Sequence, residues 1–358
     1  MDKNLYILAL GTLETHKKLV WSEIKKYLKS PNFPSEFKIP QKYKDLENFH
    51  WKVTNEYSER KGKYLRPTLL MLSNSCMGGS NEEALKTAAA MQLSEDWILI
   101  HDDIEDDSLE RRGKPTLHRM YNPPLAINSG DSIHAIMWKV LFDNLSKLGL
   151  DKSQKIVEEF YSIMMRTTLG QTVDIKWFTE NKLNLTDEDW YFVADSKSSY
   201  YTIAGPIRLG AIIADATPTQ LQLLTKFGLQ LGRVFQLVDD ILDVTSDFKG
   251  LKKQVGNDIF EGKRTILLGH LLRVAGGKDK EKLTFILKKS RNEKTEEEIL
   301  WVINKMHEYK SVDYARKLAR KHKEKAESIF DNDLKFLSKK PERQEFKNLI
   351  TFILERDH

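Results

Sequence analysis

Apolar residues recur every three or four positions along much of this 358-residue chain. One run is Leu224, Phe227, Leu231, Phe235, Val238 and Leu242, and another is Ile156, Phe160, Ile163 and Met164. This spacing gathers apolar side chains on one face of an α-helix. The sequence shows neither the strict alternation of a half-buried strand nor an Asn-Gly or Asp-Gly hairpin signal between apolar runs. It therefore predicts an all-α helical bundle, with residues 29–45 as an irregular connection.

Composition narrows the classes of protein that remain. The net charge of +5 is mild, and no stripe of basic and aromatic residues suggests a nucleic-acid partner. No apolar run approaches the roughly 18 residues that a membrane-spanning helix needs, and the N-terminal apolar patch lacks the basic leader of a signal peptide. Cys76 is the only cysteine, so an intrachain disulfide and a cysteine-based metal cage are excluded. We expect a cytoplasmic protein with no membrane span.

Two acidic clusters of the form D-D-x-x-D end two of the apolar runs. Their members are Asp102, Asp103 and Asp106 in the first cluster and Asp239, Asp240 and Asp243 in the second. Residues four apart share one face of a helix, so the outer carboxylates of each cluster line up. Upstream on the second face, Gly232 and Gln236 should keep it open and polar. Carboxylates crowded among apolar residues need a cation, and ligands made only of oxygen suit Mg²⁺.

Basic residues flank these clusters in the sequence. They are Lys63 and Arg66 before the first cluster, Arg111 and Arg112 after it, and Lys253, Lys263 and Arg264 after the second. Cations beside metal-binding carboxylates imply an anionic ligand that contacts both, and arginine forks together with lysine point charges are typical of diphosphate binding. The sequence therefore predicts a site in which aspartates hold Mg²⁺, the metal and the basic residues hold a diphosphate, and the apolar helices hold a hydrocarbon.

Over roughly residues 60–270, the chain resembles the trans-isoprenyl diphosphate synthases. The stretch HDDIEDDSLERRGKPTLH resembles the first aspartate-rich motif of that family, and FQLVDDILDVTSD resembles the second. The segments GKYLRP, GQTVDI, the Lys197-Ser198 pair and GNDIFEGKRT occupy the order that the family shows. The resemblance implies an isoprenoid-synthase helical bundle, a single domain around a central cavity, usually in a homodimer. Residues 56–358 would form the synthase domain, and residues 1–55 a helical extension of unknown role.

The resemblance implies a Mg²⁺-dependent prenyltransferase that condenses isopentenyl diphosphate head-to-tail with an allylic diphosphate. Three Mg²⁺ ions, for which Mn²⁺ can substitute, would be held by Asp102, Asp103, Asp106, Asp239, Asp240 and Asp243. The allylic diphosphate would contact Arg111, Lys197, Lys253 and Lys263. Isopentenyl diphosphate would contact Lys63, Arg66 and Arg112. Gln171 and Gln236 would add polar contacts near the reacting carbons. The catalytic set would be Asp102, Asp103, Asp239, Asp240, Lys197 and Arg111, with the released diphosphate as proton acceptor.

The chain departs from the family pattern in the region expected to bind isopentenyl diphosphate. Glu95 stands seven positions before the first aspartate, where the family commonly has histidine, and a carboxylate there would repel a diphosphate. We therefore expect Glu95 to point elsewhere or to pair with a basic residue, with Lys63 and Arg66 as candidates. Ser198 replaces a common threonine but keeps its hydroxyl group.

Trp97 is the candidate for the residue that limits product length. It lies five positions before Asp102, about 7.5 Å along the helix at ~1.5 Å per residue. In the family, a bulky side chain at this position resembles a floor beneath the growing hydrocarbon, with Ile98 beside it and the small Ser94 one turn earlier. The expected product is geranylgeranyl diphosphate (C20), with farnesyl diphosphate (C15) as the runner-up. The alternative for Trp97 is an ordinary core position.

Two other functions stay open from the sequence. A class I terpene cyclase also uses D-D-x-x-D, although it typically carries a second metal site of asparagine, serine and glutamate instead of a second aspartate cluster. A non-catalytic subunit of a heteromeric prenyl synthase generally loses one cluster, whereas this chain keeps both. Both alternatives therefore rank behind the synthase.

Overall fold

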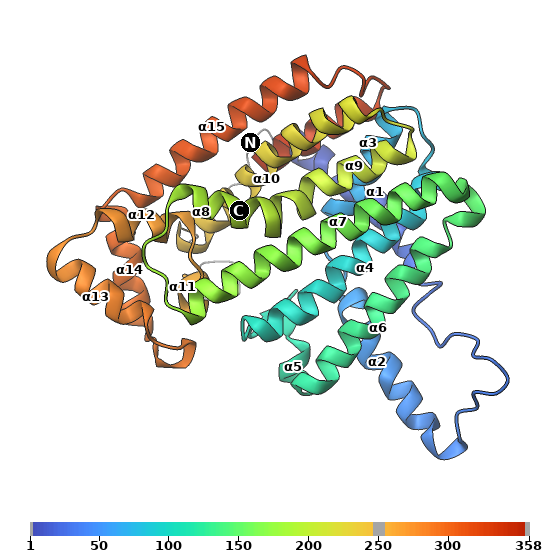
Figure 1. Cartoon of the computed structure of the whole chain (residues 1–358), viewed down its shortest axis with the longest axis horizontal. Helices are drawn as coiled ribbons and strands as arrows, with labels where there is room; N and C mark the ends of the chain where they lie inside the picture. Colours follow the sequence, from blue (N-terminus) through green and yellow to red (C-terminus); the bar gives the residue numbers. More distant parts are fainter. Residues whose placement is uncertain (1–2, 246–254, 355–358) are drawn as a thin grey trace.

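The computed structural model describes residues 3–245 and 255–354, and these are almost entirely helical (Figure 1). The first half of the chain forms α1 (Lys3–Ile24), η1 (Gln41–Tyr43), α2 (Lys44–Arg60), α3 (Leu65–Cys76), α4 (Asn81–Glu105), α5 (Leu117–Met120), α6 (Pro123–Phe142) and α7 (Leu145–Thr179). The second half forms α8 (Asp187–Val193), the π-helix η2 (Ala194–Ala204), α9 (Gly205–Ile213), α10 (Pro218–Thr245), α11 (Asn257–Glu261), α12 (Ile266–Val274), α13 (Gly277–Leu287), η3 (Arg291–Glu293), α14 (Glu296–Glu308), α15 (Ser311–Asn332) and α16 (Glu342–Leu354). The all-α prediction is confirmed. Within the described residues, none of the helices is both long enough and apolar enough to cross a membrane.

Within residues 3–245 and 255–354, one short hairpin interrupts the helices, and it follows the first aspartate cluster. Its strands β1 (Glu110–Arg111) and β2 (Lys114–Pro115) pair antiparallel. The sequence prediction lacked this hairpin because its turn is Arg112-Gly113 rather than Asn-Gly or Asp-Gly. Both turn residues have positive φ, 53° and 75°, as in the tight turns that match the twist of paired strands. Glycine adopts its part of this turn without strain.

Two long helices, α4 and α10, carry the aspartate clusters near their C-terminal ends. Helix α4 begins with a capping box, in which Ser80 and Glu83 satisfy each other's backbone N–H groups, and it packs against α6, α3 and α1. Helix α10 packs against η2, α15 and α9. The first cluster therefore sits where α4 ends at Glu105, and the second lies in the last two turns of α10.

The buried face of α10 rotates along its length. Leu224, Phe227 and Leu231 are fully buried, as the apolar periodicity predicts. Further along, the buried positions are Val234, Leu237, Ile241 and Val244, whereas Phe235, Val238 and Leu242 are only half-buried. The reason is a change of partners, because α10 leaves the core that it shares with α1, α3, α9, α15 and α16 and enters the core formed with α11–α15.

Gly232 does not keep a polar face open, and that prediction is wrong. A Cβ atom at this position would lie 2.5 Å from Cα of Ser199 in η2, which is closer than any ordinary contact. The glycine instead lets α10 approach η2 closely. One turn later, this approach brings Gln236 within hydrogen-bond distance of Ser198.

Candidate active site

Arg111 and Arg112 leave the hairpin in different directions, because Arg111 belongs to strand β1 whereas Arg112 lies in the turn with a positive φ. Arg111 Nε donates to both carboxylate oxygens of Asp103, at 3.0 and 3.2 Å, and Arg111 Nη2 also contacts Asp103. Arg112 Nη1 instead donates to the carbonyl oxygen of Tyr57 at 2.7 Å and to Asp96 Oδ1 at 2.9 Å. One arginine therefore faces the end of α4, and the other faces α2 and the middle of α4.

Three of the predicted polar residues converge on the first cluster from distant parts of the chain. Lys197 Nζ from η2 lies 3.6 Å from Asp102 Oδ1. Gln171 Nε2 from α7 donates to the same oxygen at 3.2 Å. Lys263 Nζ, which follows α11, lies 2.8 Å from Asp106 Oδ2. Lys197 and Lys263, two of the residues predicted to bind the allylic diphosphate, thus lie beside these two carboxylates.

Burial and these charges decide the ionisation of the cluster. Burial by itself would raise the pKa of Asp102, but the positive charges of Lys197, Lys263 and Arg111 outweigh it and lower that pKa. Burial raises the pKa of Asp106 to about 6, and the neighbouring negative charge of Asp102 adds to the rise against the opposing charge of Lys263. Burial opposes the charge of Lys263, yet the carboxylates around it raise its pKa well above the ordinary value. The first cluster is therefore a dense set of paired charges.

The second cluster is linked to the first through η2. Ser198 Oγ donates to Gln236 Oε1 at 2.7 Å, and Gln236 Nε2 donates to Asp240 Oδ1 at 2.7 Å. Asp240 Oδ2 is buried and accepts no hydrogen bond within the part of the chain that the structure describes. Burial, together with the negative charge of Asp258, raises the pKa of Asp240 to about 7. Asp239 lies half-buried beside it.

Asp103 and Asp243 have partners other than those predicted. Asp103 is completely buried and, besides Arg111, accepts a hydrogen bond of 2.6 Å from Tyr57 Oη. Asp243 accepts from the backbone N–H groups of Asn257 at 3.1 Å and Asp258 at 3.2 Å, where α11 begins. These contacts give no support to the metal-binding roles predicted for the two carboxylates. Asp243 instead holds the start of α11, and Asp103 holds the side chains of Arg111 and Tyr57.

A second charged region lies toward the middle of α4, and the ion pair of Arg66 and Glu95 forms its centre. Arg66 Nη2 donates to Thr202 Oγ1 at 2.9 Å, and its guanidinium lies over the ring of Tyr201 at 4.5 Å. Arg66 Nη1 lies 3.1 Å from Glu95 Oε2. The expectation that Glu95 pairs with a basic residue is confirmed. Lys63 is exposed in the connection between α2 and α3.

The three residues predicted to limit product length lie along α4 against the main core. The Trp97 ring stacks on His134 of α6, with 4.0 Å between ring centroids. Trp97 and Ile98 both pack against the core cluster formed with α3, α6, α7, α9 and η2. Ser94 is buried, and its hydroxyl oxygen lies 3.2 Å from Tyr201 Oη. The floor prediction is compatible with this placement but is not tested by it.

Two carboxylates that pair with the lysines of the site were missed from the sequence. Asp174 Oδ2 lies 2.9 Å from Lys197 Nζ, and Glu261 Oε2 lies 2.7 Å from Lys263 Nζ. Both belong to quoted motifs, GQTVDI and GNDIFEGKRT, so position within a motif was the signal that could have found them. Lys253, predicted to contact the allylic diphosphate, lies outside the described residues.

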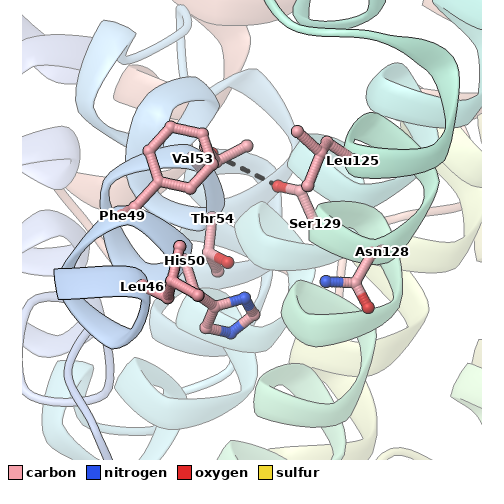
Figure 2. Close-up of a pocket in the computed structure, with 8 residues that line it drawn as sticks. All are labelled: Leu46, Phe49, His50, Val53, Thr54, Leu125, Asn128 and Ser129. Atoms are coloured by element: carbon pink, nitrogen blue, oxygen red, sulfur yellow. Dashed lines mark hydrogen bonds between the residues drawn. The ribbon is translucent and has the colours of Figure 1, made fainter. Parts of the chain in front are cut away.

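A separate cavity of about 260 Å³ lies between α2 and α6 (Figure 2). It is lined by Leu46, Phe49, His50, Val53, Thr54, Leu125, Asn128 and Ser129. Ser129 Oγ donates across it to the carbonyl oxygen of Val53 at 3.3 Å. Its lining contains neither lysine nor arginine, so it does not suit a diphosphate, and the aspartate clusters remain the candidate site.

Comparison with known proteins points to one family. The model of the polyprenyl synthetase family matches residues 49–306. Geranylgeranyl diphosphate synthase of Saccharolobus solfataricus is 36% identical over 265 residues, which are 74% of this chain and 78% of that protein. A short chain isoprenyl diphosphate synthase of Methanothermobacter thermautotrophicus is 33% identical over 305 residues, 83% of this chain and 87% of that protein. The crystal structure of geranylgeranyl pyrophosphate synthetase from Pyrococcus horikoshii superimposes with a TM-score of 0.83 at 27% identity, covering 98% of this chain and 99% of that one.

Proposed function

The chain belongs to the polyprenyl synthetase family, and from this premise we infer that it is a short-chain prenyltransferase. It joins isopentenyl diphosphate head-to-tail to an allylic diphosphate and forms an all-trans product. Relatives named geranylgeranyl diphosphate synthase and short chain isoprenyl diphosphate synthase support a product of this class. We propose geranylgeranyl diphosphate, with farnesyl diphosphate as the next choice.

The single observation that carries this proposal is the pair Lys197 and Ser198. Lys197 lies beside Asp102 of the first cluster, while the next residue, Ser198, reaches Asp240 of the second cluster through Gln236. Both aspartate clusters therefore face one polar region, into which Lys263 also projects its charge. Two acidic clusters joined by cations across one site suit a diphosphate bound between them.

The carboxylates fit a divalent cation. Asp240 Oδ2 is a buried acceptor without a hydrogen-bond donor among the described residues, and Asp102 and Asp106 share a helix face. As they stand, no three carboxylate, histidine or cysteine side chains in residues 3–245 and 255–354 lie close enough together to hold an ion by themselves. Mg²⁺ suits such a site because it keeps several waters and takes phosphate oxygens as ligands. We propose that Asp102, Asp106, Asp239 and Asp240 hold Mg²⁺ together with the diphosphate.

The reaction then follows from what the side chains can bind. Arg111, Lys197 and Lys263 hold the allylic diphosphate and offset the negative charge that grows as its carbon–oxygen bond breaks. When bound, Mg²⁺ supplies further positive charge to the same leaving group. Lys63, Arg66 and Arg112 hold isopentenyl diphosphate, whose double bond attacks the allylic carbocation. The released diphosphate accepts the proton that leaves the new chain, so no side-chain base is needed.

We propose that the protein is a homodimer that uses the outer faces of α6 and α7, which follow one another in the chain and contact each other. Large apolar side chains are exposed there: Phe142 by 64%, Tyr161 by 60%, Met165 by 52% and Leu169 by 54%. Tyr161, Met165 and Leu169 are four residues apart and form one stripe along α7. A stripe of this kind is typical of a surface that another chain covers.

We also propose a supporting role for residues 1–55, ahead of the synthase domain in residues 56–358. Helix α1 packs against α3, which carries Arg66, and against α4, which carries the first cluster.

A cytoplasmic location is proposed because the sole cysteine, Cys76, is free and buried.

The proposal is tested with the purified chain, isopentenyl diphosphate, Mg²⁺ and allylic starters of five, ten and fifteen carbons. Dephosphorylated products are separated by chromatography. We expect a C20 alcohol that is absent when Mg²⁺ is chelated and returns with Mg²⁺ or Mn²⁺. Cyclic hydrocarbons would instead indicate a terpene cyclase, and a chain inactive with every starter would indicate a non-catalytic subunit. Sedimentation of the same sample tests the homodimer.

A further inference from the structure

Lys263, one of the cations beside the first aspartate cluster, is held in place by Glu261. Glu261 is the last residue of α11, and its side chain is 2% exposed. Its Oε2 atom lies 2.7 Å from Lys263 Nζ, and Lys263 Nζ lies 2.8 Å from Asp106 Oδ2. A buried carboxylate on one side and the cluster on the other thus decide where the lysine charge sits.

Glu261 is itself held by two residues of the motifs, Ser108 and Asn257, and by Arg291 from outside them. Its other oxygen, Oε1, accepts hydrogen bonds from Ser108 Oγ at 3.2 Å and from Asn257 Nδ2 at 2.7 Å, and it lies 3.2 Å from Arg291 Nη1. Arg291 Nη2 also donates to Asn257 Oδ1 at 2.9 Å. Arg291 begins η3, in the connection between α13 and α14, and is 13% exposed. Arg291 is distant from α11 in the sequence, yet it binds both Asn257 and Glu261 of that helix.

Lys294, three residues after Arg291, binds the backbone of α11. Its side chain is buried, and Nζ donates to the carbonyl oxygens of Ile259 and Phe260, at 2.9 Å each. Carbonyl groups at the end of a helix lack partners within the helix and favour a cation. At the opposite end of α11, Asp243 of the second cluster accepts from two backbone N–H groups. The short helix is thus held between the second cluster and the connection at residues 288–295.

We propose that Arg291 and Lys294 are positioning residues for prenyl transfer, which fix α11 and, through Glu261, hold Lys263 where it binds the allylic diphosphate. The inference rests on the proposed function. Within the described part of the chain, their side-chain hydrogen bonds go to α11 rather than to the aspartate clusters, so they act on the substrate through other residues. Small displacements of such a supporting shell move the charged group that it holds, and this changes the binding that the group provides.

The first test is steady-state kinetics on Arg291→Ala, Arg291→Lys and Lys294→Met, with Lys288→Ala as a control on the same connection, where Lys288 is exposed. Arg291→Ala and Lys294→Met should raise KM for the allylic diphosphate by about tenfold and leave KM for isopentenyl diphosphate unchanged, because Arg66 and Arg112 contact other elements. Arg291→Lys should restore part of the loss, and Lys288→Ala should match wild type. An Arg291→Ala variant with unchanged KM values, or with both KM values raised equally, would overturn the proposal.

Hydrogen exchange provides a second test that needs no activity. In the substrate-free protein, amides of residues 257–262 should exchange faster in Arg291→Ala and Lys294→Met than in wild type, with α4 unchanged. Glu261→Gln, which leaves Arg291 in place, should show the same kinetic pattern, and its effect should not add to that of Arg291→Ala. Unchanged exchange in α11 or fully additive effects would refute the coupling. If wild type makes no prenyl product at all, the proposed function fails. The exchange result still shows whether Arg291 and Lys294 fix α11.

Discussion

Glu95 Oε2 lies 3.1 Å from Arg66 Nη1, so a carboxylate sits beside a cation proposed to bind isopentenyl diphosphate. Glu95 Oε1 also lies 3.5 Å from Arg112 Nη2. The same side chain thus orders both arginines and cancels part of their charge. This pairing explains how a glutamate is tolerated in a region that binds an anion.

Replacing Glu95 by glutamine should strengthen isopentenyl diphosphate binding. The amide keeps an oxygen for Arg66 but removes the negative charge, so KM for isopentenyl diphosphate should fall by roughly threefold to tenfold. KM for the allylic substrate serves as the internal control and should stay constant. A large loss of activity in a folded variant would show that the carboxylate charge is needed to orient the arginines.

Arg66→Met should weaken the same substrate. The variant loses a charge-assisted contact worth ~1.5–3 kcal/mol, which corresponds to about a ten- to hundredfold rise in KM for isopentenyl diphosphate. Initial rates at varied isopentenyl diphosphate and saturating allylic diphosphate measure this. If the rise fell on the allylic substrate instead, the assignment of Arg66 would be incorrect.

Asp102 and Asp103 are neighbours in the sequence, but their substitution by asparagine should have different effects. Asp102→Asn should lower turnover by about a hundredfold or more with an unchanged melting temperature, because it removes a charge at the reacting centre. Asp103→Asn breaks the buried contacts with Arg111 and Tyr57, and it should lower the free energy of unfolding by about 3–5 kcal/mol. Urea unfolding and turnover of both variants distinguish the two roles. If the two variants lost equal free energy of unfolding, the contacts of Asp103 would not give it a stabilising role that Asp102 lacks.

Trp97→Ala should lengthen the product. Removing the ring that stacks on His134 opens volume beside α4, so chromatography should show prenyl chains longer than those of wild type. Trp97→Phe keeps much of the bulk and should leave the product length unchanged. An unaltered product from a folded, active Trp97→Ala enzyme would make Trp97 an ordinary core residue.

His322 should make stability depend on pH. Burial, with the charges of Arg233, Lys325 and Lys321, lowers the pKa of His322 to about 4, and the ring lies between Gln230 and Tyr191. Between pH 6.5 and 4 the unfolded chain binds this proton and the folded chain does not. The stabilisation is therefore complete above about pH 6.5 and is lost as pH falls toward 4, by at most about 1.4 kcal/mol per pH unit. His322→Gln should flatten this part of a urea-unfolding profile, and an unchanged slope would contradict the assignment.

The sequence by itself determined the helical class, the two aspartate clusters and most of the cations. These features depend on short-range regularities: apolar spacing near 3.6 residues, carboxylates four apart, and basic residues within a few positions of a motif. The end of α4 at Glu105, within the first aspartate cluster, agrees with them. The turn Arg112-Gly113 was missed because its glycine follows an arginine rather than an asparagine or an aspartate.

Only the tertiary structure decided which charges meet. Asp102 and Asp103 are adjacent in the sequence, yet one faces Lys197 and Gln171 and the other is buried against Tyr57. The pairing of Arg291 with Glu261 likewise depends on how distant segments pack. Hydrogen bonds need donor and acceptor atoms within about 3.2 Å, and exposed charges more than about 10 Å apart are largely screened. Residues far apart in the sequence therefore acquire their roles only when the packing of α4, α10, α11 and η2 brings them together.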